Sequence, residues 1–184
     1  QLRMKIFLRS PLRRKLLARS MRLLDQIKGQ EVLETTADDA LGVAMQNAGG
    51  GGGASWSSLA AGETHAELLA EAGVGRIHLA SLPQLPFEDA AFDAIVASDL
   101  LEYVDKPAEL MAELHRVMRS RTRLILHVRR KRRTLVGLFR KWSGLTDPTR
   151  PMVRPGFTPA ELFDVLKDGF DVQERTGYGR FLTE

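Results

Sequence analysis

The feature that most constrains the fold is a strand, a turn and a helix in close succession within residues 85–104. Residues 92–97, FDAIVA, form a short apolar run that follows a turn signal at Pro86. Such a run is typical of a strand buried on both faces of a parallel sheet. Residues 98–102 would then lie at the carboxyl end of that strand, which is where open α/β sheets bind their ligands.

Strand and helix patterns alternate along the rest of the chain, which predicts an α/β fold with a mostly parallel sheet and helices on both faces. We expect Asp105 to cap the next helix, with Pro107 in its first turn. Thr158 and Glu161 form a capping-box pattern that starts the last helix. The remaining predicted helices span residues 39–48 and 63–72, and the remaining strands span residues 32–34, 55–59, 76–80, 122–128, 170–176 and 180–183.

With the helix sequence ELMAELHRVMRS and the strand sequence TRLILHV, the segment closely resembles the class I S-adenosylmethionine (SAM)-dependent methyltransferases, especially their small-molecule, type 11-like branch. The resemblance covers most of the chain from Glu31 onwards. It implies a Rossmann-like sheet of seven strands, mostly parallel, with an antiparallel last strand. It also implies that residues 32–34, 92–97 and 122–128 lie in adjacent central strands.

The residue pattern predicts an N-terminal amphipathic basic helix at residues 1–28, and the resemblance implies a methyltransferase-like domain at residues 29–184. Residues 129–157 are basic and then proline-containing, and in the family this stretch is a variable, lid-like insertion that meets the substrate. The resemblance therefore implies methyl transfer to a small-molecule or lipid-like acceptor, whose identity the lid sequence does not reveal.

The loop after the first strand is where the family holds SAM, and here the chain departs from the family's glycine pattern. Glu34 and Asp39 match common family choices, whereas Thr36, Asp38 and Ala40 occupy the three glycine positions. Glycine suits such a turn because it accepts positive φ and places no Cβ against the ligand. The carboxylate of Asp38 would also repel the carboxylate of SAM. We expect SAM as the cofactor, with its binding weakened or lost.

Two further cofactor positions differ from the family. Its second strand usually ends in an acid that binds the ribose, but here Ala60 and Ala61 follow and the nearest acid is Glu63. Ser81 stands where an Asp usually meets the adenine. The resemblance thus implies a cofactor site lined by Glu34, Thr36, Asp38, Asp39, Ser81 and Ser98.

Composition indicates an ordinary globular domain with no transmembrane run, since 43% of the 184 residues are apolar and 27% are charged. The chain has no cysteine, which excludes disulfides and thiolate chemistry, and we expect a cytoplasmic location. The four histidines lack the spacing of a zinc site, so no metal is expected. No G-x-S-x-G motif supports a hydrolase.

Charge is unevenly distributed along the chain. Residues 1–28 carry nine Lys or Arg and one acid, and residues 114–141 carry eleven Lys or Arg and no acid. The first block is expected to form a helix that starts at Ser10 and Pro11 and stops at Gly29. Its apolar stripe favours packing against the sheet, with membrane-surface binding as the alternative. The two basic blocks also suggest an anionic membrane surface or RNA as a partner.

Two polar residues near the strand ends have open roles. His127 lies near the carboxyl end of a central strand, where it could act as a general base or simply satisfy a local hydrogen bond, and the second is favoured. Glu102 and Tyr103 occupy the Glu and His places of the family's LEH motif, and the tyrosine lacks a base useful near neutral pH. Two functions stay open, a SAM-dependent enzyme and a catalytically inactive relative that binds a partner.

Overall fold

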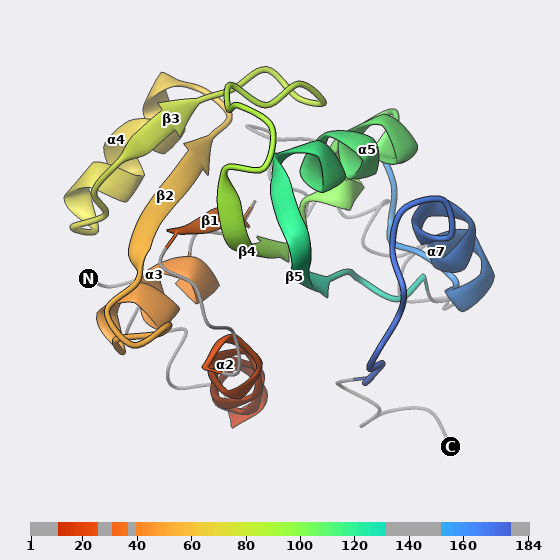
Figure 1. The fold of residues 1–184 in the computed structure, drawn as a ribbon, viewed down its shortest axis with the longest axis horizontal. Helices are drawn as coiled ribbons and strands as arrows, with labels where there is room; N and C mark the ends of the chain where they lie inside the picture. The colour runs from red at the N-terminus through yellow and green to blue at the C-terminus, as the bar shows by residue number, and fades with distance from the viewer. Residues whose placement is uncertain (1–10, 26–30, 37–39, 132–151, 178–184) are drawn as a thin grey trace, which may run out of the picture.

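The computed structural model describes residues 11–25, 31–36, 40–131 and 152–177. It is an α/β fold in which one parallel sheet lies between helices (Figure 1). The strands are β1 (Glu31–Thr36), β2 (Ser55–Ala60), β3 (Ile77–Leu79), β4 (Phe92–Ser98) and β5 (Met118–His127). The helices are α2 (Pro11–Leu24), α3 (Ala40–Asn47), α4 (Glu63–Glu71), η1 (Leu101–Tyr103), α5 (Pro107–Val117) and α7 (Pro159–Leu166).

The sheet has the order β3-β2-β1-β4-β5, and every described strand pair is parallel. The chain therefore runs outward from β1 to β3 and then returns to the other side of β1 to form β4. This return makes the boundary between β1 and β4 the topological switch point of the sheet. The predicted adjacency of residues 32–34, 92–97 and 122–128 is confirmed.

Each face of the sheet has its own hydrophobic core. On one face, Val32, Val96 and Ile125 pack with Leu24 of α2 and with residues of α3. On the other face, Leu33 and Ile95 pack with the buried side of α5 and with Leu166 of α7. Because neighbouring residues of a strand point to opposite faces, the near-continuous apolar run of β4 is explained by this burial on both sides.

Helix α2 begins at Pro11, as the sequence predicts, but ends at Leu24 and so stops short of Gly29. Its apolar stripe, which includes Leu16, Leu17 and Met21, packs on the β1-β4-β5 part of the sheet. The favoured interpretation of the stripe as core is therefore confirmed. Within the described residues no helix is long and apolar enough to cross a membrane.

Two predicted helix starts had different outcomes. The capping box of α7 is confirmed, since Thr158 Oγ1 accepts a hydrogen bond from the Glu161 N–H at 3.2 Å and Glu161 Oε2 accepts from the Thr158 N–H at 2.8 Å. For α5, Pro107 lies in the first turn as predicted, but the predicted cap, Asp105, is wrong. The N-cap residue is Lys106, which makes no side-chain hydrogen bond, because the helix begins at Pro107, two residues after Asp105.

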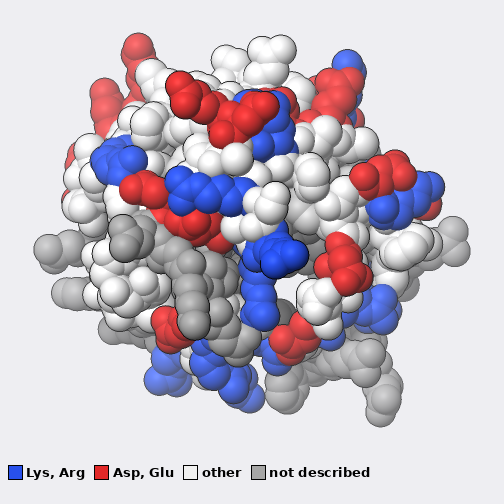
Figure 2. Space-filling model, viewed as in Figure 1, with Lys and Arg blue, Asp and Glu red and all other residues white. Residues whose placement is uncertain are grey.

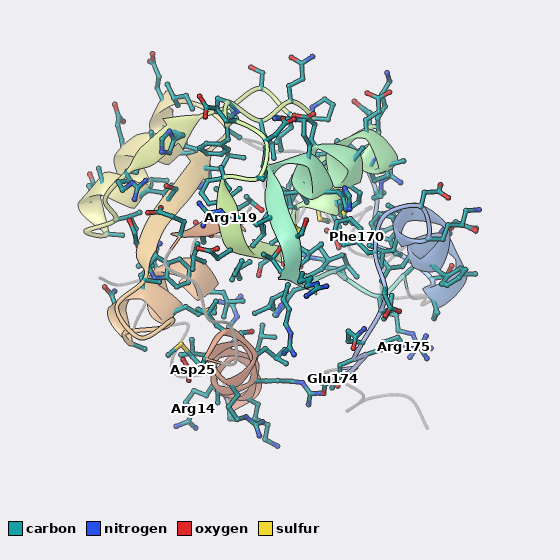
Figure 3. All side chains as sticks on the ribbon, in the orientation of Figure 1. Arg14, Asp25, Arg119, Phe170, Glu174 and Arg175 are labelled. Carbon is teal, nitrogen blue, oxygen red and sulfur yellow. The ribbon has the colours of Figure 1, made fainter. Side chains whose placement is uncertain are left out.

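The predicted strand at residues 170–176 is not formed, since residues 170–177 carry no strand. Side chains hold this segment in place instead. The Phe170 ring meets His115 edge-on at 5.5 Å between centroids, and Glu174 forms an ion pair with Arg19 of α2 (Figure 3). The predicted strand at residues 180–183 lies outside the described residues, so the seven-strand count and the antiparallel last strand are not confirmed.

Arg116 of α5 fixes the turn that precedes β4. Its guanidinium donates to the carbonyl oxygens of Phe87 at 2.9 Å and Leu85 at 3.2 Å. It also pairs with Asp89 and with Glu113, each at 2.8 Å. Glu113 in turn accepts from the Leu85 N–H at 3.1 Å. One planar cation thus ties α5 to the turn through both backbone and side-chain contacts.

We expect Arg116→Met to lower the free energy of unfolding by about 1–3 kcal/mol, because two carbonyls lose a charged donor and Glu113 loses its partner. Urea unfolding followed by circular dichroism measures this. The control Lys167→Met removes one exposed ion pair, to Asp164 at 3.4 Å, and should change stability by less than about 0.5 kcal/mol. Equal losses in the two variants would contradict the structural role of Arg116.

Candidate functional site

The candidate site lies at the carboxyl ends of β1 and β4, at the switch point of the sheet. Glu34 of β1 is 1% exposed and lies on the face that α2 and α3 cover. Its side chain reaches Gly42 of α3 so closely that a Cβ on Gly42 would overlap the carboxylate group. Gly42 therefore leaves the room that the buried acid needs, a role that its place inside a helix did not reveal.

Ser98 ends β4 on the same face as Glu34. It is the register partner of Thr36 in β1 and of His127 in β5. Ser98 is 7% exposed, and its Oγ has no hydrogen-bond partner in the described part of the chain. A buried hydroxyl without a partner is unfavourable unless a ligand or water completes it. Two of the sequence-predicted cofactor residues, Glu34 and Ser98, are thus brought to one edge of one face.

The other predicted cofactor residues are placed differently. Asp38 and Asp39 lie outside the described residues, and Thr36 is described by its backbone pairing alone. Ser81 is exposed in the turn after β3, two strands away from β1. Glu63, the acid nearest to the end of β2, is exposed in the first turn of α4.

The end of β2 changes the interpretation of the ribose position. Ala60 is 0% exposed and packs in an apolar cluster with Val43, Leu69 and Val74. Ala61 is exposed, and its N–H donates to Nδ1 of His65 at 3.2 Å. A carboxylate at residue 60 would be buried among apolar side chains, whereas one at residue 61 would face the open edge.

A second group of polar residues follows β4, within the segment 98–102 that the sequence places at the ligand-binding edge. Asp99 has φ of 52° and so lies in the left-handed region, which costs energy for a residue other than glycine. Its N–H donates to the His127 carbonyl oxygen at 2.9 Å, and its carboxylate pairs with Arg129 at 3.3 Å. Strained residues of this kind often occur at functional sites.

Glu102 is the most enclosed residue of this group, with 0% exposure. Its carboxylate accepts a short hydrogen bond from the Arg129 N–H, and its carbonyl oxygen accepts from the N–H groups of Val153 and Arg154 at 2.9 and 3.2 Å. Burial raises the pKa of the Glu102 carboxyl above its usual range. Glu102 thus links η1 by hydrogen bonds to Arg129, which precedes residues 132–151, and to Val153 and Arg154, which follow them.

His127 is held by a helix distant in sequence. Its Nε2 lies 3.1 Å from Oγ of Ser20, which is 1% exposed in α2. Burial lowers the pKa of His127 to about 4, so the imidazole is neutral at neutral pH and is a weak base. The interpretation that His127 satisfies a hydrogen bond is therefore favoured over that of a general base.

The residues present fit SAM in part. Glu34, Ser98 and the neighbouring β1 end provide buried polar groups at the edge where nucleotide ligands bind, whereas β2 ends without an acid. Within the described ranges no group of three His, Asp or Glu residues is arranged to hold a metal ion.

Comparisons with known proteins agree with this fold. Residues 47–126, less than half of the chain, match the family model described as a methyltransferase domain. No curated protein matches the sequence. The structure resembles many solved structures of SAM-dependent methyltransferases. Residues 47–126 thus resemble a methyltransferase domain, and the fold of the chain is that of SAM-dependent methyltransferases.

Three solved structures illustrate the likeness. YcgJ from Bacillus subtilis has a TM-score of 0.62 at 16% identity, covering 83% of this chain and 66% of that one. A SAM-dependent methyltransferase from Methanosarcina mazei has a TM-score of 0.62 at 19% identity, covering 81% and 82%. One from Aquifex aeolicus has a TM-score of 0.61 at 15% identity, covering 90% and 85%. The chain thus spans about two thirds of the length of YcgJ.

The pKa shifts predict stability changes of opposite sign. The unfolded chain protonates His127 near 6.5 and the folded chain near 4, so stability falls as pH drops through this window, by about 3 kcal/mol in total. His127→Gln should remove that loss.

Glu102 has a raised pKa when folded, so its stabilising contribution is present below 4.5 and is lost as pH rises through the folded value. Glu102→Gln should therefore help most at neutral pH.

Urea unfolding of the wild type and both variants between pH 4 and pH 8 measures these differences. The two variants act as controls for each other, because their stability differences from wild type should change with pH in opposite directions. Differences that do not vary with pH would contradict the burial of a neutral imidazole and of a carboxyl group.

Proposed function

We propose that this protein transfers a methyl group from SAM to a small-molecule or lipid-like acceptor, and that it binds SAM weakly. The observation that carries the proposal is that Glu34 and Ser98, both buried and polar, lie on one face near the carboxyl ends of β1 and β4, at the switch point of the sheet. Ligands of open α/β sheets bind at this point, at the carboxyl ends of the strands. The matched methyltransferase domain supports the same assignment.

When bound, SAM supplies a methyl group already activated by its sulfonium centre, so the protein's task is to bind and orient the two reactants. Glu34 is the residue whose placement best suits cofactor binding, because it is enclosed near the carboxyl end of β1, and Ser98 lies at the same edge of the same face. Proximity and orientation need no metal ion and no side-chain nucleophile. Residues 132–151 belong to the lid-like stretch and lie outside the described residues. The acceptor class is therefore proposed from the resemblance to the family.

Weak cofactor binding is proposed from the residues that replace the usual ones. Thr36, Asp38 and Ala40 stand at the family's glycine positions, and each unfavourable backbone or missing polar contact costs about 1–3 kcal/mol. The end of β2 adds a further loss, since Ala61 offers the ribose hydroxyls no carboxylate. Together these losses are large enough to remove a micromolar affinity.

The same replacements favour a second candidate function, a catalytically inactive methyltransferase-fold protein that acts as a binding or scaffold module. The two candidates make different predictions for the cofactor. An enzyme must bind SAM in the presence of its acceptor, whereas a scaffold can keep the fold after cofactor affinity is gone.

Calorimetric titration of the whole chain with SAM and with S-adenosylhomocysteine distinguishes the candidates. We expect weak binding, with a dissociation constant above about 100 μM, because several contacts are lost together. Tight binding would overturn the proposed weakness and support a fully competent methyltransferase. No binding under any condition would support the scaffold.

A restored loop tests whether the rest of the site is intact. We expect Thr36→Gly, Asp38→Gly and Ala40→Gly, combined with Ala61→Asp, to raise SAM affinity by at least about ten-fold. The matched control replaces Ala61→Asp with Ala60→Asp, which buries the new carboxylate in an apolar cluster and should unfold or weaken the protein. Failure of the restored loop to bind SAM would contradict a cofactor site at this edge.

We also propose a salt-sensitive contact with an anionic membrane surface or RNA, in which α2 supplies the exposed cations. The helix has five Lys or Arg and no acid, and Arg14, Lys15 and Arg22 are exposed. Figure 2 shows Lys and Arg side chains at the lower edge of the molecule, where Figure 1 places α2. Because its apolar stripe packs against the sheet, the contact would be electrostatic, without insertion into the bilayer. Arg130 is a further exposed cation after β5, whereas the charge of Lys131 is paired with Glu161 at 2.8 Å.

Cosedimentation with phosphatidylserine vesicles and a gel shift with mixed RNA, both from 50 to 300 mM salt, test this contact. We expect binding that weakens as salt rises and that falls at least about ten-fold in the variant Arg14→Gln, Lys15→Gln, Arg22→Gln, since each cation near an anionic surface contributes about 1 kcal/mol. The control Lys106→Gln, Lys167→Gln removes exposed cations elsewhere. No binding in either assay would refute the proposal.

A further inference from the structure

A row of polar side chains from three elements crosses the sheet beside the proposed cofactor site. Ser98 and His127 are register partners in parallel strands, so their side chains point to the same face. Val96 and Ile125, two residues earlier, pack with α2, which identifies that face. Ser20 of α2 completes the row, because its Oγ lies 3.1 Å from Nε2 of His127.

Two atoms of this row are buried without a hydrogen-bond partner in the described part of the chain. They are Oγ of Ser98 and Nδ1 of His127. Each belongs to the last residue of its strand, at the edge of the sheet where ligands bind. Two unsatisfied polar atoms on register-partner residues are unfavourable unless a further group hydrogen-bonds to them. A group that reached both atoms would satisfy both.

The chemistry of the row indicates which group fits. Serine hydroxyls are neutral, and His127 is neutral at neutral pH because burial lowers its pKa to about 4. A buried ionised ligand would find no opposite charge in this row, and its desolvation would be costly. A hydroxyl group is neutral and both donates and accepts a hydrogen bond, so it matches either tautomer of His127 and either orientation of Ser98.

We propose that the row of Ser20, His127 and Ser98 binds a hydroxyl group of the methyl acceptor, which is then an alcohol or a phenol. The assignment of this ligand as the acceptor rests on the proposed function. Ser20 holds the imidazole ring through Nε2, which leaves Nδ1 for the ligand. His127 is too weak a base to remove the proton in advance, so its contribution is to orient the hydroxyl oxygen.

The test uses the whole chain with 15N-labelled histidine, phenol as the probe and no SAM. Long-range 1H–15N correlation spectra report the tautomer and hydrogen bonding of each imidazole, and His127→Gln assigns the signal. We expect phenol to shift Nδ1 of His127 in a saturable way. Anisole keeps the ring and the oxygen but lacks the O–H donor, so it should bind at least about five-fold more weakly. No shift, or equal shifts with both probes, would overturn the proposal.

A pair of serine variants locates the site. Ser98→Ala should weaken phenol binding at least about five-fold, whereas Ser57→Ala removes another buried serine, from the opposite face of the sheet, and should leave phenol binding unchanged. If Ser98→Ala binds phenol as the wild type does, the row is not the site. Because SAM is absent, a failed SAM titration leaves this result standing, and a failed phenol titration leaves the cofactor proposal standing.

Discussion

The structure depends on the burial of β1 between two parallel neighbours. Val32 and Leu33 send side chains into opposite cores, and the backbone of β1 pairs with β2 on one side and β4 on the other. A strand in this position has neighbours on both sides. The chain adds β2 and β3 on one side of β1 and then crosses back to add β4 and β5 on the other side. This crossing brings Glu34 and Ser98 to the same edge of the sheet. The strand order alone determines this placement, whatever contacts the two side chains make.

Apolar runs and local caps explain why most of the fold was predictable from the sequence. Residues 92–97 form a short, apolar and mostly buried run, residues 122–128 form a largely apolar run in which only Ile125 is buried, and the Thr158 capping box works through contacts within one turn. Residues 170–176 have an equally strand-like sequence but no strand, because pairing needs a partner edge that local pattern cannot supply. Long contacts such as Phe170 with His115 hold that segment instead.

The candidate site was predictable where position along a strand determines it. Glu34 and Ser98 follow from their places at strand ends, and their burial agrees with that prediction. The Ser20 contact to His127 joins residues 107 positions apart, and the space for Glu34 depends on the missing Cβ of Gly42. Both features exist only when separate helices are packed on the sheet, so no local pattern in the sequence contains them.

The site combines buried polar atoms that favour ligand binding with a loop that disfavours cofactor binding. The free-energy cost of the buried polar atoms helps to distinguish a role in binding from a role in folding. Ser98, Glu102 and His127 each bury a polar atom without a partner in the described residues, and apolar side chains of similar size would pack there at less cost. The stability of the fold does not explain why these polar atoms are buried at such a cost. A ligand that binds at this edge of the sheet and hydrogen-bonds to them would explain it. The altered glycine loop lowers affinity for one ligand, the cofactor, and leaves the polar atoms of the neighbouring strands in place. Cofactor affinity and the capacity of this edge to bind a polar group are therefore separable properties of the same fold.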